Sequence, residues 1–380
     1  MLFGKYVKSF AKYIINELLE LKTAFLIYKK TVVIKRTLGS YNKIDNEIYN
    51  QHKRIWAPIY HKFKKINLDI YCYISGIISS YYIPEIVYYN IVEPTLNNRN
   101  FSHAYSDKNI YDLLFEEKNL FPQTVLRRIN GVYYDEEYKN ISLTPLYFQN
   151  IIKKFNKIIL KPSTGTGGGR NVVMFELNNN VIRSKENILN IEYLENIRYQ
   201  NFILQEYIEQ SDYFAQFNKS SLNTIRMFTY RSCYSEKIDV LSSVLRIGRE
   251  GSIVDNQAAG GISIGIKKDG TLNNFAINKY GSKFTSFNGY DFTNYNRIPQ
   301  YDAMKRIAIY IAERMLYTRL LGIDISYDKN EKIRIIEINV KNIEINFLQM
   351  NNGPLFQSEV NEIIQYCRRN YKTINVGMYV

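Results

Sequence analysis

The sequence predicts an α+β protein with largely antiparallel sheets and a mostly helical N-terminal part. Two observations lead to this expectation. Apolar residues recur at spacings of three and four from Phe10 to Ile27, which is the period of a helix. From about residue 105, short runs rich in β-branched residues alternate with turns of Gly, Asn and Asp, which is typical of paired strands.

The expected elements follow in chain order. The first 100 residues are expected to be mostly helical, with short turns such as the one near residues 93–100. Strands are then expected at residues 157–160, 171–177, 201–208, 223–231, 238–248, 261–270, 322–328 and 332–340, and helices near 186–199, 301–320 and 355–369. We therefore expect three parts, covering residues 1–104, 105–209 and 210–380.

The composition indicates a globular protein with an anionic partner. Apolar residues make up 46% of the 380 positions, enough for two or three packed cores, and the net charge is +14. Nucleotides, nucleic acids and membrane surfaces would all suit this charge. The three cysteines include no CxxC pair, which fits a reducing cytoplasm. Neither a cleavable signal nor a membrane span is predicted.

The N-terminal segment is strongly basic. Between Lys5 and Arg36, eight Lys or Arg residues alternate with apolar ones, and the only acids are Glu17 and Glu20. The favoured interpretation is the solvated face of a helix that packs on the core. The alternative is docking on an anionic membrane, which suits a basic amphipathic helix.

The histidines constrain the chemistry. His52, His61 and His103 are the only three, and all precede residue 104. Chemistry located later in the chain would therefore proceed without histidine as general base, nucleophile partner or metal ligand. This removes most hydrolase mechanisms.

A glycine-rich loop lies in "ILKPSTGTGGGRNV", residues 159–172. It is not a P-loop, because Lys161 precedes the glycines, and not a dinucleotide fingerprint, because Arg170 occupies the last glycine position. The favoured interpretation is a hairpin lid whose backbone N–H groups and Lys161 bind phosphate. A hairpin tip without a ligand is the alternative, and whether Arg170 contacts phosphate stays open.

Two carboxylates are expected to face each other in the hairpin "GIDISYDKNEKIRIIEIN". If Asp328 and Ile333 close the turn, antiparallel register places Asp324 opposite Glu337, about 5 Å apart between Cβ atoms. Asn339 shares the face of Glu337. Such hard oxygen ligands suit Mg²⁺ on nucleotide phosphates. The alternative is a solvent-facing edge without a metal.

Taken together, these motifs resemble the ATP-grasp ligases, most of all the group associated with sugar transfer and surface-polysaccharide synthesis. The resemblance covers roughly residues 50–355 and includes the 13-residue separation of Asp324 and Glu337. The helical N-terminal part departs from D-alanine:D-alanine ligases, which usually carry an open α/β domain there. This departure favours the sugar-associated group over the dipeptide ligases.

The resemblance implies an ATP-grasp fold that holds ATP and one or two Mg²⁺ ions between two α+β subdomains. Phosphate contacts are implied for Lys108, Lys161 and the loop residues Ser163, Thr164, Gly165, Thr166, Gly167, Gly168 and Gly169. Adenine would meet the hinge residues Gln205, Glu206, Tyr207 and Ile208, and ribose would meet Asp212.

Metal, catalytic and substrate roles follow from the same resemblance. The metal ligands would be Asp324, Glu337 and Asn339, with Glu337 bridging. Arg226, Arg246 and Lys161 would act on the γ-phosphate and the acyl-phosphate. The substrate pocket would contain Asn223, Asn256, Gly260, Gly261 and Gln349.

The implied activity is carboxylate–amine ligation through an acyl-phosphate. We expect an amino acid or amine to be joined to a sugar carboxylate, or an amino sugar, in capsule or O-antigen synthesis, in the cytoplasm with peripheral contact at the inner membrane. One alternative is a ligase that makes a small peptide or modified amino acid, and another is an inactive ATP-binding relative. A third is a non-catalytic basic protein that binds nucleic acid or membrane. Nucleic acid is not expected as a partner, because the arginines are scattered and no nucleic-acid motif occurs.

Overall fold

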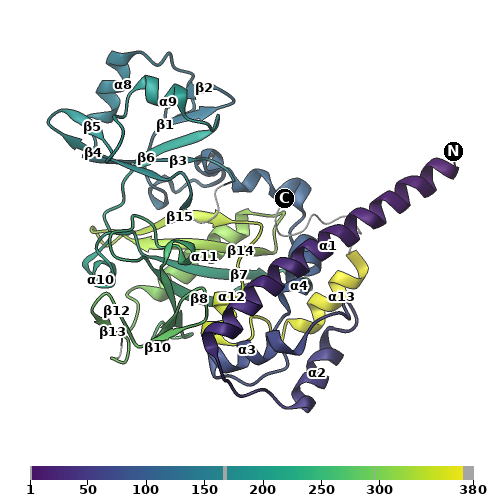
Figure 1. Ribbon diagram of the computed structural model, residues 1–380. Coiled ribbons are helices and arrows are strands. Elements are labelled where there is room, and N and C mark those ends of the chain that lie inside the picture. Colours follow the sequence, from purple (N-terminus) through teal and green to yellow (C-terminus); the bar gives the residue numbers. More distant parts are fainter. Residues whose placement is uncertain (1, 166–168, 295, 371–380) are drawn as a thin grey trace.

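The computed structural model describes residues 2–165, 169–294 and 296–370. Within these ranges the chain forms two large antiparallel sheets and a group of N-terminal helices that packs beside the second sheet (Figure 1). The expected α+β class is confirmed.

The N-terminal part is helical, as expected. Its elements are α1 (Leu2–Leu38), α2 (Asn46–Trp56), α3 (Lys65–Ser75), α4 (Glu85–Val87), the π-helical turn η1 (Tyr88–Val92), α5 (Glu93–Leu96) and α6 (Arg99–Ser102). Asp45 caps α2 by accepting the N–H of Glu47, and α3 ends at Gly76 in a left-handed conformation. The first half of α1 extends away from the body (Figure 1). Among the described helices, none combines the length and apolarity that a membrane span requires.

Short helical turns lead from this part into the first sheet. They are η2 (Ala104–Ser106), η3 (Lys108–Ile110), α7 (Tyr111–Leu114) and η4 (Lys118–Leu120). The sheet contains β1 (Thr124–Ile129), β2 (Val132–Tyr134), β3 (Lys157–Pro162), β4 (Val173–Asn178), β5 (Val181–Arg183) and β6 (Phe202–Glu206), in the order β2-β1-β6-β3-β4-β5. Helices α8 (Pro145–Ile152) and α9 (Ile191–Asn196) pack on it through Phe148 and Leu194.

The second sheet is larger and lies between two helical layers. Its strands are β7 (Thr224–Arg231), β8 (Ile238–Ile247), β9 (Ile262–Ile266), β10 (Leu272–Ile277), β11 (Lys283–Phe284), β14 (Leu320–Tyr327) and β15 (Ile333–Asn339), in the order β11-β10-β9-β8-β7-β14-β15. The remaining elements are α10 (Asp212–Ala215), η6 (Gln257–Ala259), the hairpin β12 (Ser286–Phe287) and β13 (Tyr290–Asp291), α11 (Tyr301–Arg314), α12 (Asn346–Asn352) and α13 (Val360–Asn370).

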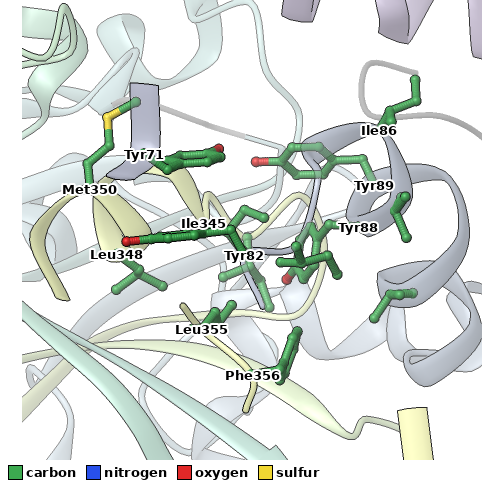
Figure 2. Packing of buried hydrophobic residues seen from close by; sticks show 14 of the residues in the cluster. Tyr71, Tyr82, Ile86, Tyr88, Tyr89, Ile345, Leu348, Met350, Leu355 and Phe356 are labelled. Carbon is green, nitrogen blue, oxygen red and sulfur yellow. The ribbon is translucent and has the colours of Figure 1, made fainter. Parts of the chain in front are cut away.

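The two faces of this sheet carry different partners because side chains alternate along a strand. Ile225 and Ile323 point into a core that includes Met304 of α11. On the other face, Phe228 and Val244 join a core shared with α12 and the N-terminal helices. Figure 2 shows tyrosines of the N-terminal part packed among residues 345–356. The N-terminal part and the second sheet therefore share one hydrophobic core.

Each strand expected from the sequence overlaps an observed strand. The helix expected at 301–320 is shorter and ends at Arg314, because the chain turns after Met315 and strand β14 begins at Leu320. The strands β1, β2, β5, β10, β11, β12 and β13 and the helices α7, α8, α10 and α12 were not predicted. In β10, the consecutive polar residues Asn273 and Asn274 hide the strand pattern.

Candidate functional site

The site is built on the hairpin of β14 and β15. Asp324 lies directly opposite Glu337, as the register argument predicts. The predicted closing pair was wrong, however, because Tyr327 and not Asp328 pairs with Ile333. A bulge beside Asp324 then shifts the register by one residue and restores the expected pairing. Asp328 instead stabilises the turn, where its carboxylate accepts two backbone N–H groups.

A row of charged side chains crosses three strands on the same sheet face. Arg226 of β7 is the backbone partner of Asp324, which in turn is the partner of Glu337. Arg226 donates two hydrogen bonds to the Asp324 carboxylate, and Arg246 of β8 donates a third at 3.1 Å. The Nζ atom of Lys108 lies 2.7 Å from Oε1 of Glu337. Both carboxylates are thus paired with cations.

The arginines keep Asp324 ionised although it is buried. Burial raises the pKa of this carboxyl, but the guanidinium groups of Arg226 and Arg246 outweigh burial and hold its pKa below the ordinary value. Arg246 also pairs with buried Asp255 at 3.0 Å and donates to Asn256. For Asp255, burial raises the pKa more than Arg246 lowers it.

The glycine-rich loop begins and ends beside this row. Its root is fixed where the N–H of Lys108 donates to the carbonyl of Ser163 at 2.9 Å. At its end, a Cβ on Gly169 would lie 2.7 Å from Nδ2 of Asn256, so glycine permits the close approach. Thr166, Gly167 and Gly168 lie outside the described residues. The start of the loop therefore lies beside Lys108, and its end lies beside Asn256.

Lys161 is a buried cation at the end of β3. No ion-pair partner is found for it among the residues that the structure describes, and burial, with the nearby charge of Lys108, lowers its pKa to about 7. The hydroxyl of Ser163, two residues on, is also buried without a hydrogen-bond partner. Two ammonium groups and an unpartnered hydroxyl therefore belong to the root of one loop, which is an environment that suits an anion.

A cavity of about 1060 Å³ opens beside the charged row. Seven residues that were predicted as site residues line it, and so does Arg170. The seven are Lys108, Gly165, Arg226, Arg246, Asn256, Glu337 and Asn339. The wall also contains Lys29, Lys30 and Tyr89 of the N-terminal helices, which were not predicted to be site residues. The basic pattern of α1 was the available signal, but it was interpreted as a solvated face.

Other residues predicted to bind the nucleotide do not line this cavity. They are Lys161, Ser163, Thr164, Gln205, Glu206, Tyr207, Ile208 and Asp212. The N–H groups of Glu206 and Tyr207 donate to the carbonyls of Gln123 and Lys157, so these two groups are already used within the protein. The Glu206 carboxylate accepts from Arg334 and thereby joins the two sheets. Asp212 is exposed on α10.

Two residues predicted to line the substrate pocket are buried and form hydrogen bonds within the fold. Gln349 is fully buried, and its amide exchanges two hydrogen bonds with the backbone of Ile83, at 3.0 and 3.1 Å. Asn223 is also fully buried and donates to the carbonyl of Phe214 while its oxygen accepts from Gly248. Neither side chain lines the cavity. All of these hydrogen-bond partners lie within the fold, and the substrate roles of both residues stay predictions.

The glycines assigned to the substrate pocket shape the chain. A Cβ on Gly261 would lie 2.7 Å from the carbonyl oxygens of Asp255 and Ile247, so only glycine fits there. Gly260 has a φ of 94° at the end of η6. Neither lines the cavity, whereas the neighbouring Asn256 and Gln257 do.

The residues present fit Mg²⁺ held together with phosphate. The described residues contain no cluster of three or more His, Cys, Asp or Glu side chains that could hold a metal alone. The set of Asp324, Glu337 and Asn339 offers two carboxylates and one amide, and Mg²⁺ typically uses one or two carboxylates plus phosphate oxygens and water. The buried ammonium group of Lys161 would bind such a phosphate.

A family model described as sugar-transfer associated ATP-grasp matches residues 91–365, more than two thirds of the chain. No curated protein sequence matches significantly.

Several solved structures have detectable similarity. The ATP-grasp ligase PsnB complexed with minimal precursor is 14% identical, with 71% of this chain and 63% of that chain covered and a TM-score of 0.33. The biotin carboxylase domain of the Hydrogenobacter thermophilus 2-oxoglutarate carboxylase is 14% identical, with 69% and 45% covered and a TM-score of 0.38. The D-alanine–D-alanine ligase from Coxiella burnetii is 10% identical, with 70% and 57% covered and a TM-score of 0.36. The match spans less than two thirds of each of these chains.

Proposed function

Because this chain belongs to the sugar-transfer-associated ATP-grasp family, we propose that it is an ATP- and Mg²⁺-dependent carboxylate–amine ligase. It has the ATP-grasp fold with a helical N-terminal region, and enzymes of this fold use ATP and Mg²⁺. The observation that carries the proposal is the row of Arg226, Asp324 and Glu337 beside the glycine-rich loop. This row combines metal-binding carboxylates with phosphate-binding cations on one sheet face.

The phosphates of ATP would be held by Lys108, Lys161, Arg226 and Arg246. One or two Mg²⁺ ions would be held by Asp324 and Glu337, with Asn339 beside them, and would supply charge neutralisation at the phosphates. Since Lys108, Arg226 and Arg246 now pair with the two carboxylates, phosphate binding would give these three cations new partners and free the carboxylates for the metal.

The proposed reaction has two steps. A carboxylate oxygen of the substrate attacks the γ-phosphorus, the bond to the β-phosphate oxygen breaks, and ADP leaves. The amine then attacks the acyl carbon, loses a proton, and inorganic phosphate leaves with formation of an amide. Phosphoryl transfer depends mainly on positioning and charge neutralisation, so the absence of histidine after residue 103 is no obstacle.

The substrate proposal follows the family description. We propose that the carboxylate belongs to a sugar, or that the amine belongs to an amino sugar, and that the partner is an amino acid or amine used in capsule or O-antigen synthesis. The association of the family with sugar transfer supports this substrate class.

The cellular location is proposed to be the cytoplasm, with peripheral contact at the inner membrane. Exposed apolar side chains recur along α1 at spacings of three and four: Ile14, Leu18, Leu21, Phe25 and Tyr28. Deletion of α1 would disturb the core, because Ile27 and Ile34 are buried in it. The triple substitution Leu18→Ser, Leu21→Ser and Phe25→Ser is therefore a better test than the deletion. If α1 contacts the membrane, the triple variant should no longer co-sediment with anionic vesicles.

The activity is tested by a phosphate-release screen with Mg-ATP across pairs of carboxylates and amines, run with wild type and Glu337→Gln. We expect turnover with a sugar-containing pair and a loss of about 10²-fold in the variant. Equal turnover by both proteins with every pair would show that the metal assignment is wrong.

A further inference from the structure

We propose that the part of the cavity walled by α1 is a subsite for a phosphate-bearing sugar. Lys29, Lys30 and Lys279 would contact its phosphate, and Tyr89 and Asn346 would donate hydrogen bonds to its sugar oxygens. This inference rests on the proposed function and assigns the second substrate of the same site.

The cavity is larger than the phosphate end of a nucleotide requires. Its volume is about 1060 Å³, yet neither the hinge residues 205–208 nor Asp212 lines it. Ligand pockets usually measure about 300–1,000 Å³, so this space exceeds that of a typical single small ligand. Most of the cavity therefore extends from the charged row toward α1 and remains for a second substrate.

The α1 wall lies outside the part of the chain that the family model matches. The family match begins at residue 91, whereas Lys29, Lys30, Val33 and Ile34 of α1 all line the cavity. Specificity for a substrate is expected to come from such an unmatched element, because the proposed nucleotide contacts belong to the matched part.

The wall beside α1 is held firmly in place. The turn at residues 278–281 faces α1, and its Asn278 carboxamide accepts the N–H groups of Tyr280 and Ser282. A Cβ on Gly281 would lie 2.6 Å from Ile74 and 3.4 Å from Ile34, so the turn packs closely on α1 and α3. The subsite is thus preformed, which lowers the cost of ordering it around a ligand.

Positive charge gathers on this wall. Lys29 and Lys30 lie on α1, and Lys279 lies on the facing turn. Glu344 is an acid on the same wall, and Lys30 forms an ion pair with Glu85 with 3.9 Å between Nζ and Oε2. Lysine ammonium groups bind phosphate as point charges, and three of them around one space favour a phosphate there.

Two wall residues carry buried polar atoms without partners. Tyr89 is 1% exposed and Asn346 is 4% exposed, and among the residues that the structure describes neither the Tyr89 hydroxyl nor Nδ2 of Asn346 finds a hydrogen-bond partner. Both residues line the cavity. Unpartnered buried donors are costly, and ligand oxygens would satisfy them. Hydroxyl and ring oxygens of a sugar offer acceptors of this kind.

The test is isothermal titration of UDP-glucuronate into protein saturated with Mg-AMP-PNP, with a polyprenyl-pyrophosphate sugar in detergent as a second probe. Lys29→Gln combined with Lys30→Gln should weaken binding of the preferred probe about tenfold, and Tyr89→Phe should weaken it severalfold. The matched control is Lys35→Gln combined with Arg36→Gln, which removes the same charge from α1 outside the cavity and should leave binding within about twofold.

The outcomes separate the two proposals. Weaker binding in the cavity variants but not in the control supports the subsite, and the preferred probe identifies a soluble or a lipid-linked source. If Mg-AMP-PNP binds but neither probe does, or if the cavity variants bind both probes like wild type, the subsite is wrong while the ligase proposal stands. If Mg-AMP-PNP itself does not bind, the proposed function fails.

Discussion

Asp324 lies directly opposite Glu337 across β14 and β15, yet each carboxylate is held by cations of its own. Arg226 and Arg246 hold Asp324, and Lys108 holds Glu337. Two like charges on neighbouring positions repel unless cations stand between or beside them. These ion pairs hold both carboxylates in place, so a metal ion or a phosphate would have to compete with them.

We expect Mg²⁺ and nucleotide to bind cooperatively, because phosphate must first take over the cations that hold Asp324 and Glu337. Mg²⁺ should bind at least about tenfold more tightly in the presence of AMP-PNP than in its absence, which is a coupling free energy of about 1.4 kcal/mol. Calorimetric titration of Mg²⁺ under both conditions measures this. If Mg²⁺ binds with equal affinity with and without AMP-PNP, the cations paired with Asp324 and Glu337 do not compete with the metal.

Nucleotide binding should take up a proton at pH 8. Burial and Lys108 lower the pKa of Lys161 to about 7, so this lysine is mostly neutral at pH 8, and a bound phosphate would raise its pKa again. Titrations in buffers of different ionisation enthalpy measure the uptake. It should disappear in Lys161→Met, and equal uptake by that variant would exclude Lys161 as its source.

The same lysine should make stability depend on pH. Between pH 7 and 10.5, the unfolded chain protonates Lys161 and the folded chain does not, so stability rises with pH across this window. Below pH 7 both states are protonated and the full cost of the buried charge remains. Lys161→Met should therefore stabilise the nucleotide-free protein most below pH 7, with a gain that shrinks toward pH 10.5. Urea unfolding at several pH values checks this, and a gain independent of pH would contradict it.

Removal of Arg226 should destabilise the fold strongly. Arg226→Met leaves buried Asp324 with Arg246 as its one remaining arginine partner, and the loss of one member of a buried ion pair typically costs about 3–5 kcal/mol. Lys237→Met, which breaks the exposed pair with Asp239, is the control and should change the free energy of unfolding by less than about 1 kcal/mol. If both variants lose a similar free energy of unfolding, the buried pair of Arg226 and Asp324 contributes no more to stability than an exposed pair.

Gln349→Leu should reduce stability without changing nucleotide affinity. The substitution leaves the buried N–H and C=O of Ile83 without their partners, at a cost of about 1–3 kcal/mol for each group. Urea unfolding and AMP-PNP titration measure the two effects. Unchanged stability with a loss of substrate turnover would support the substrate role that the sequence suggested.

The central hairpin could be predicted because local rules determine it. Alternation and the polar turn placed Asp324 opposite Glu337, and an error of one residue at the turn was compensated by a bulge that the sequence does not reveal. The hydrogen bonds of Gln349 could not be predicted, because its partner Ile83 lies 266 residues away in the chain. Likewise, only tertiary packing brings Lys29 and Tyr89 to the cavity.

The most direct test of the account is the affinity for AMP-PNP with and without Mg²⁺ in wild type, Glu337→Gln and the control Glu344→Gln, which changes another acid on the cavity wall. We predict that Glu337→Gln loses at least about tenfold in affinity only when Mg²⁺ is present, and that the control stays within about twofold of wild type. If Glu337→Gln binds Mg-AMP-PNP as tightly as wild type, Glu337 does not hold the metal, which contradicts the proposed Mg²⁺ site.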